Sequence, residues 1–495
     1  MTIVRIVTSV SVCFGLAVVG RGFSRATQAQ PAPRNVKTIY AELCANCHGP
    51  TLAGGLAPSL LDDTWSFGGD DTSIAQSIRD GRPTTAMPPF KAVLSAQEIR
   101  ALVIYIREAS DRAQRDPTGV SRRGAPVPLP TTPLRSEQHA FKLEAVAEDL
   151  DTPWGIAWLP DGRLLVTERP GRLRIIENDQ LQPAPIGGVP PVWVKQDGGL
   201  MDVAVHPQFA TNGWIYLSFS EAGGAPGASA TKIIRARLRG DQLVEHETLF
   251  QPRPAHYWVD NRHFGSRFLF DSQGRLFYSI GDRGHEQDAQ DLSSPYGKLH
   301  RVYDDGRAPN DNPFVDRAGA VPTIWSYGHR NQQGLAIHPV TGELWAAEHG
   351  PRGGDELNRI EPGRNYGWPV ITYGMNDDGT PITDRTEQEG MEQPVVQWTP
   401  SIAVCAIDFY TGDRFPGWKH DLFATALAHR ELRRLRIDGR KVVHQEVLFK
   451  GLGRVRDVAT GPDGYVYVAL NMPDRVVRLI PAPTDASTGP QHQDR

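Results

Sequence analysis

Cysteine is scarce in this sequence, with four residues in 495, which is too few for a disulfide framework. An excess of charge of either sign is also lacking, because 53 Lys and Arg residues face 57 Asp and Glu residues, for a formal net charge of -4. The chain therefore has no electrostatic footprint for nucleic acid or for an anionic membrane. Beyond the N-terminal segment, no apolar run is long enough to cross a bilayer. We expect a globular protein with room for more than one domain.

Glycine and proline, by contrast, are abundant, with 49 and 40 residues, which favours a turn-rich β architecture over a helical one. Beyond Phe141 the chain repeats a unit made of a strand, a turn rich in Pro, Asp and Gly, and a second strand. The six units begin near Trp154, Met201, Arg267, Gln333, Cys405 and Arg456. Repeats of this size are typical of a β-propeller. We predict an all-β, six-bladed propeller over residues 141–482, with Cys405 in its core, and a disordered polar tail at 483–495.

The N-terminal segment, residues 1–29, is predicted to be a secretory signal peptide. Arg5 precedes an apolar run over residues 6–20, and small residues at 26–29 form a cleavage site. We therefore expect a periplasmic protein whose mature chain has no transmembrane span. An uncleaved membrane anchor is the alternative.

The motif Cys44-Ala-Asn-Cys47-His48 is typical of c-type haem attachment, in which two thiols bind the haem and the histidine binds iron. Met87, in a Met-Pro-Pro loop, is the candidate for the second axial ligand. A redox or zinc pair is the alternative for the cysteines, and a buried gap-filling side chain is the alternative for Met87. Residues 35–113 resemble a small, all-α class I cytochrome c domain. A Pro-rich linker at 114–140 joins it to the propeller.

The densest group of functional side chains lies in Trp325–Pro369, which contains GHRNQQGLAIHPVTGELWAAEHGPRGGDELNRIEPGRNYGWP. Arg330 and Asn331 offer planar donors that suit carboxylates, and Asp355, Glu356 and Tyr366 offer oxygens. Ordinary polar turns of a large β protein are the alternative interpretation.

This stretch resembles the signature of the soluble quinoprotein sugar dehydrogenases, the glucose/sorbosone and aldose types that use pyrroloquinoline quinone (PQQ). The family shares a six-bladed propeller. In the family, a histidine matching His263 in His-Phe-Gly-Ser-Arg-Phe is the general base for the sugar hydroxyl. A carboxylate matching Asp282 in Ile-Gly-Asp-Arg-Gly-His-Glu-Gln orients that base. Taken singly, each residue is more often structural, and the ordered series of motifs favours the functional interpretation.

The resemblance also implies the cofactor sites. Positions implied to contact PQQ are Arg330, Asn331, Arg454, Arg456, Gln287 and Asp197. The resemblance places a calcium ion against the quinone at the carbonyls of Gly350 and Pro351, and a second, structural calcium at Glu356 and Tyr366. For Arg454 and Arg456, two solvent-exposed strand arginines are the alternative.

The sequence departs from the family pattern at three positions. A glutamine that contacts the cofactor falls at Asp197, a tyrosine near the cofactor falls at Asp377, and a cofactor-binding lysine falls at Ala428. These changes could weaken PQQ binding or alter the substrate pocket. They leave the base, its partner and the arginines in place.

The predicted function is oxidation of an aldose or related sugar to its lactone or acid, with PQQ, calcium and haem c as cofactors. Electrons would pass to the fused haem and then to a downstream respiratory acceptor. A calcium-dependent propeller hydrolase of the lactonase type and a ligand-binding propeller are the alternatives. The loops 223–230 and 375–386 would determine which sugar binds, and the sequence offers no rule for reading them.

Overall fold

The structure is a computed structural model that describes residues 34–62, 64–115 and 127–483. The predicted signal peptide, residues 116–126 of the predicted linker and nearly all of the predicted tail lie outside these residues. The described domains all belong to one compact unit, Arg34–Arg495. Among the described helices, none combines the length and apolar character needed to cross a membrane.

The N-terminal part is helical. Its helices are α1 (Val36–Leu43), α2 (Ala45–His48), α3 (Asp71–Asp80) and α4 (Ala96–Arg115). Asn35 and Asp70 cap α1 and α3 by accepting a hydrogen bond from a backbone N–H. Ser95 and Glu98 form a capping box before α4, since each side chain accepts from the other residue's backbone N–H. Apolar faces of α1, α3 and α4 pack into one core. This is the small all-α domain that the sequence predicts.

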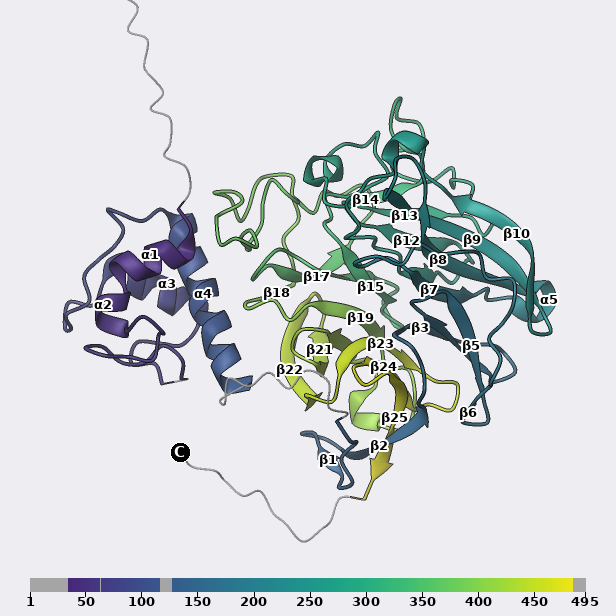
Figure 1. Cartoon of the computed structure of the whole chain (residues 1–495), viewed down its shortest axis with the longest axis horizontal. Helices are drawn as coiled ribbons and strands as arrows, with labels where there is room; N and C mark the ends of the chain where they lie inside the picture. Colours follow the sequence, from purple (N-terminus) through teal and green to yellow (C-terminus); the bar gives the residue numbers. More distant parts are fainter. Residues whose placement is uncertain (1–33, 63, 116–126, 484–495) are drawn as a thin grey trace, which may run out of the picture. The chain divides into compact units, whose positions relative to one another are not determined.

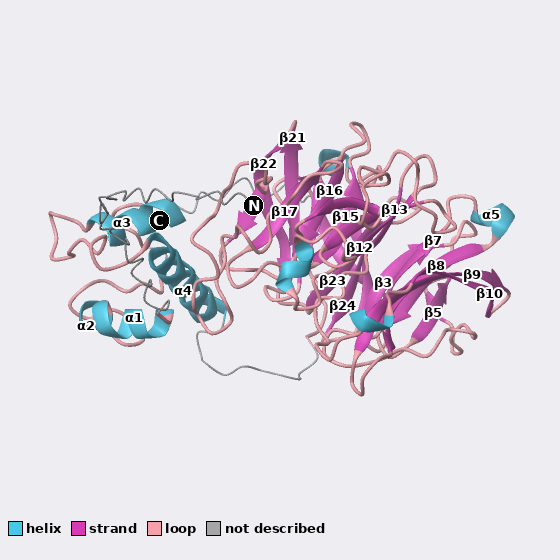
Figure 2. Ribbon diagram, turned by 90° about the horizontal axis from the view of Figure 1, so that it is seen from above, coloured by secondary structure: helices cyan, strands magenta, loops and turns pink. Residues whose placement is uncertain are grey.

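The described residues from 127 onward form six antiparallel sheets, which confirms the prediction of a six-bladed propeller (Figure 1). Figure 2 shows these strands in magenta. The first blade contains β3 (Pro153–Trp158), β4 (Leu164–Glu168), β5 (Arg172–Glu177) and β6 (Gln180–Leu181). The second contains β7 (Leu200–Val205), β8 (Trp214–Ala222), β9 (Ser229–Arg239) and β10 (Gln242–Phe250), with α5 (Phe209–Asn212) between β7 and β8.

The next three blades follow the same order. The third contains β11 (Phe268–Phe270), β12 (Leu276–Ile280), β13 (Lys298–Val302) and β14 (Ile324–Tyr327). The fourth contains β15 (Gln332–Ile337), β16 (Leu344–Glu348), β17 (Asp355–Ile360) and β18 (Val396–Trp398). The fifth contains β19 (Val404–Phe409), β20 (Leu422–Ala426), β21 (Glu431–Asp438) and β22 (Lys441–Lys450). Within the described part of the propeller, three short 3-10 helices lie in connections, namely η1 (Pro254–His256), η2 (Glu286–Ala289) and η3 (Pro416–Trp418).

The sixth blade joins the two ends of the propeller. Its strand order is β1 (Leu134–Arg135), β2 (Ala140–Ala147), β25 (Arg475–Ala482), β24 (Val466–Asn471) and β23 (Arg454–Thr460). Leu143 on β2 lies opposite Leu479 on β25, so a strand from the start of the propeller completes its last sheet. This pairing closes the ring and covers the edge of β25.

The sequence repeats coincide with the first strand of each blade. The first strands β3, β7, β11, β15, β19 and β23 contact one another in succession around the ring. They are rich in buried apolar residues, and apolar clusters fill the space between neighbouring sheets. Cys405 on β19 is fully buried, as predicted for a core thiol.

One buried ion network ties five blades together at these first strands. Arg267, just before β11, donates to Asp202 on β7 at 3.2 Å and to Asp457 on β23 at 3.0 Å. It also donates to the carbonyl of Gln333 on β15 at 2.9 Å. The carboxylates of Asp202 and Asp457 accept further bonds from the backbone N–H groups of Phe268 and Ile156. We call Arg267, Asp202 and Asp457 the axial ion cluster.

Candidate functional site

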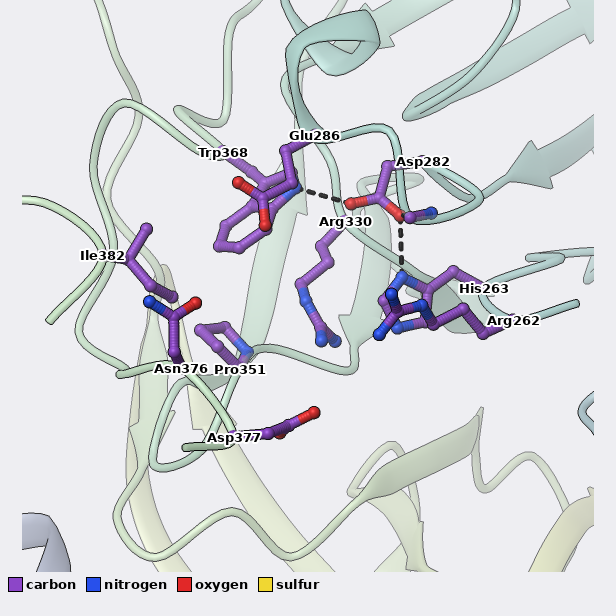
Figure 3. A pocket seen from close by; sticks show the side chains of 11 residues that line it. Arg262, His263, Asp282, Glu286, Arg330, Pro351, Trp368, Asn376, Asp377 and Ile382 are labelled. Carbon is purple, nitrogen blue, oxygen red and sulfur yellow. Dashed lines mark hydrogen bonds and ion pairs between the residues drawn. The ribbon is translucent and has the colours of Figure 1, made fainter. Parts of the chain in front are cut away.

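A pocket lies where loops of the third and fourth blades meet (Figure 3). The loop before β11 contributes Arg262 and His263, and the loop after β12 contributes Asp282 and Glu286. The remaining side chains drawn in Figure 3 are Arg330, Pro351, Trp368, Asn376, Asp377 and Ile382. Polar groups thus converge from separate loops on a rigid ring, which is the usual position for a binding site.

His263 and Asp282 form a hydrogen-bonded pair in this pocket. His263 Nδ1 lies 2.7 Å from Asp282 Oδ1, and Asp282 is fully buried. His263 has a φ of 52°, in the left-handed region, which a non-glycine residue occupies only when its surroundings hold it there. With Nδ1–H donating to the carboxylate, Nε2 is left as the nitrogen able to take a proton.

Asp282 is held in its charged form by its neighbours. Trp368 Nε1 donates to Asp282 Oδ2 at 2.7 Å, and the backbone N–H of Gly284 donates to Oδ1 at 2.8 Å. Burial opposes ionisation, but the hydrogen bond and charge of His263, the charge of Arg330 and the Gly284 bond outweigh it. The pKa of Asp282 therefore lies below its usual value. The pair has the geometry of a general base with an orienting carboxylate.

Four arginines near this pair lack acidic partners. Among the described residues, none of Arg169, Arg330, Arg454 and Arg456 forms an ion pair with a carboxylate, whereas most other buried arginines do. Burial, followed by the charge of Arg456, lowers the pKa of Arg454. Burial also lowers the pKa of Arg169, against the opposing charge of Asp197. Such a set of half-buried, mutually repelling cations fits a ligand that carries several carboxylates. We call these four residues the arginine cluster.

His349 lies among the same cations, although the sequence did not single it out. Its Nε2 is buried and has no hydrogen-bond partner among the described residues. Burial and the charges of Arg456, Arg330, His263 and Arg454 hold its pKa well below the usual value. Its imidazole is therefore neutral near pH 7 and free to contact a ligand.

Two of the residues predicted to contact PQQ accept hydrogen bonds from the protein, and a third lies outside the pocket. Asn331 Oδ1 accepts from the N–H of Gly265 at 3.0 Å, so only its amide nitrogen remains for a ligand. Asp197 Oδ2 accepts from the backbone N–H of His263 at 3.3 Å, so this carboxylate contacts the backbone of the base. Gln287 is exposed on η2 and does not line the pocket.

At the predicted calcium site beside the pocket, both backbone carbonyls already accept hydrogen bonds from the protein. The Gly350 carbonyl accepts one hydrogen bond, from Arg330 Nη1 at 2.8 Å, and a carbonyl oxygen has a second lone pair. The Pro351 carbonyl accepts from the N–H of Gly354 and from Ser401 Oγ. Over residues 34–62, 64–115 and 127–483, no cluster of three or more His, Cys, Asp or Glu side chains could hold a metal. A metal here would need carbonyl ligands.

At the second predicted calcium site, only one of the two side chains is available. Burial and then the charge of Glu348 raise the pKa of Glu356 to about 8, so this buried carboxylate beside a second one suits a cation. The Tyr366 hydroxyl, however, donates to the Arg359 carbonyl at 2.7 Å and accepts from the N–H of Glu361. Tyr366 could therefore serve a cation only through its backbone carbonyl.

The predicted haem ligands lie in the helical domain. Cys44 and Cys47 are free thiols at the start and within α2, and His48 ends that helix. His48 Nδ1 lies 3.1 Å from the Pro58 carbonyl, which orients the ring and leaves Nε2 for a metal. Met87 packs against the apolar core that also contacts Cys44. These residues fit a covalently attached haem.

Comparisons with known proteins agree with this fold and site. Residues 150–478 match the family model described as Glucose / Sorbosone dehydrogenase. Residues 31–106 match the model described as Cytochrome C oxidase, cbb3-type, subunit III. The chain therefore belongs to the glucose/sorbosone dehydrogenase family and carries a cytochrome c domain in front of the propeller.

Individual relatives cover the propeller. Aldose sugar dehydrogenase YliI of Escherichia coli (strain K12) is 42% identical over 332 residues, which is 66% of this chain and 89% of that protein. The apo-form structure of soluble aldose sugar dehydrogenase from E. coli gives a TM-score of 0.65 at 39% identity, over 69% of this chain and all of that one. A PQQ-bound aldose sugar dehydrogenase from Streptomyces coelicolor gives a TM-score of 0.57 at 28% identity, over 72% of this chain and all of that one.

Proposed function

We propose that this protein is a periplasmic, PQQ-dependent sugar dehydrogenase that passes electrons to its own c-type haem. The substrate is an aldose or related sugar, and the product is the lactone or acid. The observation that carries the proposal is the His263–Asp282 pair, 2.7 Å apart, near the arginine cluster, which has no carboxylate partner among the described residues.

The residues of the pocket have separate roles in the oxidation. His263 Nε2 takes the proton of the anomeric hydroxyl, and Asp282 stabilises the resulting imidazolium. Trp368 and Gly284 keep the Asp282 carboxylate in position through its two oxygens. When bound, PQQ would accept the hydride that leaves the same carbon. Loss of one proton and one hydride converts the hemiacetal into a lactone, so atoms and electrons balance.

The arginine cluster and the neutral imidazole of His349 would hold PQQ. Guanidinium groups match the three carboxylates of that cofactor in charge and in planar geometry. Calcium would be held by the carbonyls of Gly350 and Pro351, with the spare lone pair of Gly350 as the available donor, and would act as a Lewis acid on the bound quinone.

The fused cytochrome domain supports an intramolecular electron transfer. Oxidation of a sugar releases two electrons, and a haem accepts one at a time, so the haem must pass its first electron to a downstream acceptor before it takes the second. A tethered acceptor is present at high effective concentration. Export is supported by the signal-like N-terminal segment and by the Cys44–His48 motif.

Anaerobic visible spectroscopy tests the proposal on the full-length protein carrying haem, with PQQ and calcium added. The haem bands should change to the reduced form only when PQQ and an aldose are both present. A His263→Ala variant should still bind PQQ but leave the haem oxidised. Product formation without PQQ and without haem reduction would instead support the lactonase alternative, and ligand binding without turnover would support the binding module.

A further inference from the structure

Two loops beside the pocket also contact the cytochrome domain, which belongs to the same compact unit as the propeller. The first contact is an ion pair between Arg352, after β16, and Glu108 on α4. Both guanidinium Nε and Nη2 bind the carboxylate, at 3.1 and 2.5 Å. The two side chains are about one-fifth exposed, at 22% and 18%, so solvent screens the pair only partly.

The second contact is apolar. Met375, in the loop between β17 and β18, is 1% exposed and belongs to the core of α1, α3 and α4. Ile104 of α4 lies so close to Gly353 that a Cβ there would come within 2.7 Å of its side chain. The backbone N–H of Val36 donates to the Gly379 carbonyl at 3.0 Å. Buried apolar surface and backbone bonds therefore accompany the ion pair.

The loop held in this way is the one that lines the pocket. Asn376 and Asp377 are pocket residues, and they lie between the anchors Met375 and Gly379. Arg352 Nη1 donates to the Asp377 carbonyl at 2.9 Å while its other nitrogens bind Glu108. One guanidinium thus connects α4 directly to the backbone of the pocket wall.

The same contacts fall at positions where the sequence departs from the family pattern. The carbonyl of Asp377 accepts from Arg352, the partner of Glu108, and the carbonyl of Ala428 accepts from Arg115 of α4 at 2.9 Å. Next to Ala428, His429 Nε2 lies 3.4 Å from Asp111 of α4. Two of the three departures are therefore residues whose backbone is bound, directly or through Arg352, by the cytochrome domain.

We infer that the cytochrome domain is a structural part of the sugar pocket, in addition to its electron-transfer role. Glu108 and Met375 act as positioning residues that order the loop 375–379, so that Asn376 and Asp377 are in place before the sugar binds. A loop that is already ordered costs less entropy on binding. The inference rests on the proposed function for the identity of the ligand, but the ordering of the loop does not.

The first measurement is hydrogen exchange followed by mass spectrometry on the full-length, haem-loaded protein without PQQ or sugar. The variant Glu108→Gln removes the charge of the pair and keeps its shape, and Glu42→Gln, an exposed carboxylate on α1, is the matched control. Amides of residues 371–381 should exchange at least threefold faster in Glu108→Gln than in the wild type or in Glu42→Gln. Unchanged exchange in Glu108→Gln would overturn the inference.

The second measurement is steady-state sugar oxidation with PQQ bound and an excess of a soluble artificial acceptor, so that electron transfer to the haem does not limit the rate. Glu108→Gln should raise KM about three- to tenfold, because part of the binding energy of the sugar would then be spent on ordering the loop, and should leave kcat within about twofold. Arg352→Gln, which loses the bonds to Glu108 and to the Asp377 carbonyl, should raise KM further. An effect of Arg352→Gln without any effect of Glu108→Gln would assign the loop to the propeller alone and overturn the inference.

The two measurements separate the inference from the proposed function. If the wild type oxidises no sugar with the artificial acceptor, the proposed function fails, while the exchange experiment still decides whether the cytochrome domain orders the loop. If the wild type is active and Glu108→Gln matches it in KM and in exchange, the inference alone fails.

Discussion

The axial ion cluster and the arginine cluster are both groups of buried or half-buried charges beside the first strands of the blades, but they differ in how their charges are balanced. In the axial ion cluster, Arg267 lies between Asp202 and Asp457. Burial opposes the charge of Arg267, yet the two carboxylates outweigh it and raise its pKa above the usual value. In the arginine cluster, Arg454 and Arg456 form no ion pair with a carboxylate among the described residues, and burial, followed by the charge of Arg456, lowers the pKa of Arg454.

This difference separates a structural charge from a functional one. Charges of opposite sign that pair with one another join blades and are balanced without a ligand. Charges that are buried without partners are costly for the protein alone, and a ligand of opposite charge removes that cost. Variants at the base, in each cluster and at a buried carboxylate test this distinction.

Removal of the base should have the largest effect. His263→Ala should lower kcat by about 10²- to 10⁴-fold, the usual contribution of a positioned general base, with little change in PQQ affinity. Haem reduction in a stopped-flow instrument measures the rate. The control is His246→Ala, an exposed histidine on β10, which should retain wild-type turnover. Full activity of a PQQ-loaded His263→Ala variant would rule out His263 as the base.

Removal of the axial arginine should affect folding. Arg267→Met leaves two buried carboxylates unpaired, and we expect a loss of about 3–5 kcal/mol in the free energy of unfolding. Chemical denaturation followed by tryptophan fluorescence gives this value. Arg307→Met, where the arginine is exposed and bound to Asp305, should cost less than about 1 kcal/mol. Similar stabilities for both variants would remove the distinction between the two clusters.

Removal of a guanidinium from the arginine cluster should affect binding and leave folding intact. Arg456→Gln should weaken PQQ binding by about 10- to 100-fold, since it removes charge-assisted bonds worth about 1.5–3 kcal/mol. The unfolding free energy of the apo form should stay the same or rise, because a repelling charge is gone. Titration with PQQ followed by absorbance measures the affinity, with the exposed Arg414→Gln as control. A destabilised apo variant with normal PQQ affinity would make Arg456 structural.

The buried carboxylate of Asp408 should have the smallest effect, which is on the pH dependence of stability. Burial raises the pKa of Asp408 to about 6, although Thr460 donates two hydrogen bonds to it. Because the folded pKa exceeds the unfolded value, the stability that this group contributes is fully present below about pH 4 and is lost as the pH rises through 6. The difference in unfolding free energy between the wild type and Asp408→Asn should therefore fall by about 1–3 kcal/mol from pH 4 to pH 7. A difference that does not change with pH would contradict this.

The sequence predicted the parts of the structure that repeat or that carry a motif. Each of the six repeat units, from the one near Trp154 onward, begins at the first strand of a blade. These strands are recognisable in the sequence because they are rich in buried apolar residues. The motifs around His263 and Asp282 pointed to two side chains that the structure places in contact.

Contacts between distant segments could not be predicted in this way. The bond from Trp368 to Asp282 joins residues 86 positions apart, and no local pattern specifies it. Arg169 and His349 were missed because each is an ordinary loop residue in sequence and becomes part of the cation group only when the ring closes. For Tyr366, the motif gave the position, but the hydroxyl is used by the neighbouring backbone.

Closure of the ring through β2 and β25 also bears on how the protein is made. The ribosome produces Ala140–Ala147 more than 300 residues before the strand that covers its edge. Until Arg475–Ala482 emerges, the sixth sheet cannot form and the fifth and first blades lack a neighbour. Domains generally fold as units during synthesis, so the cytochrome domain can fold early whereas the propeller has to wait for its last strand. A chain stopped shortly before Arg475 would thus contain nearly every functional residue and still lack an assembled site.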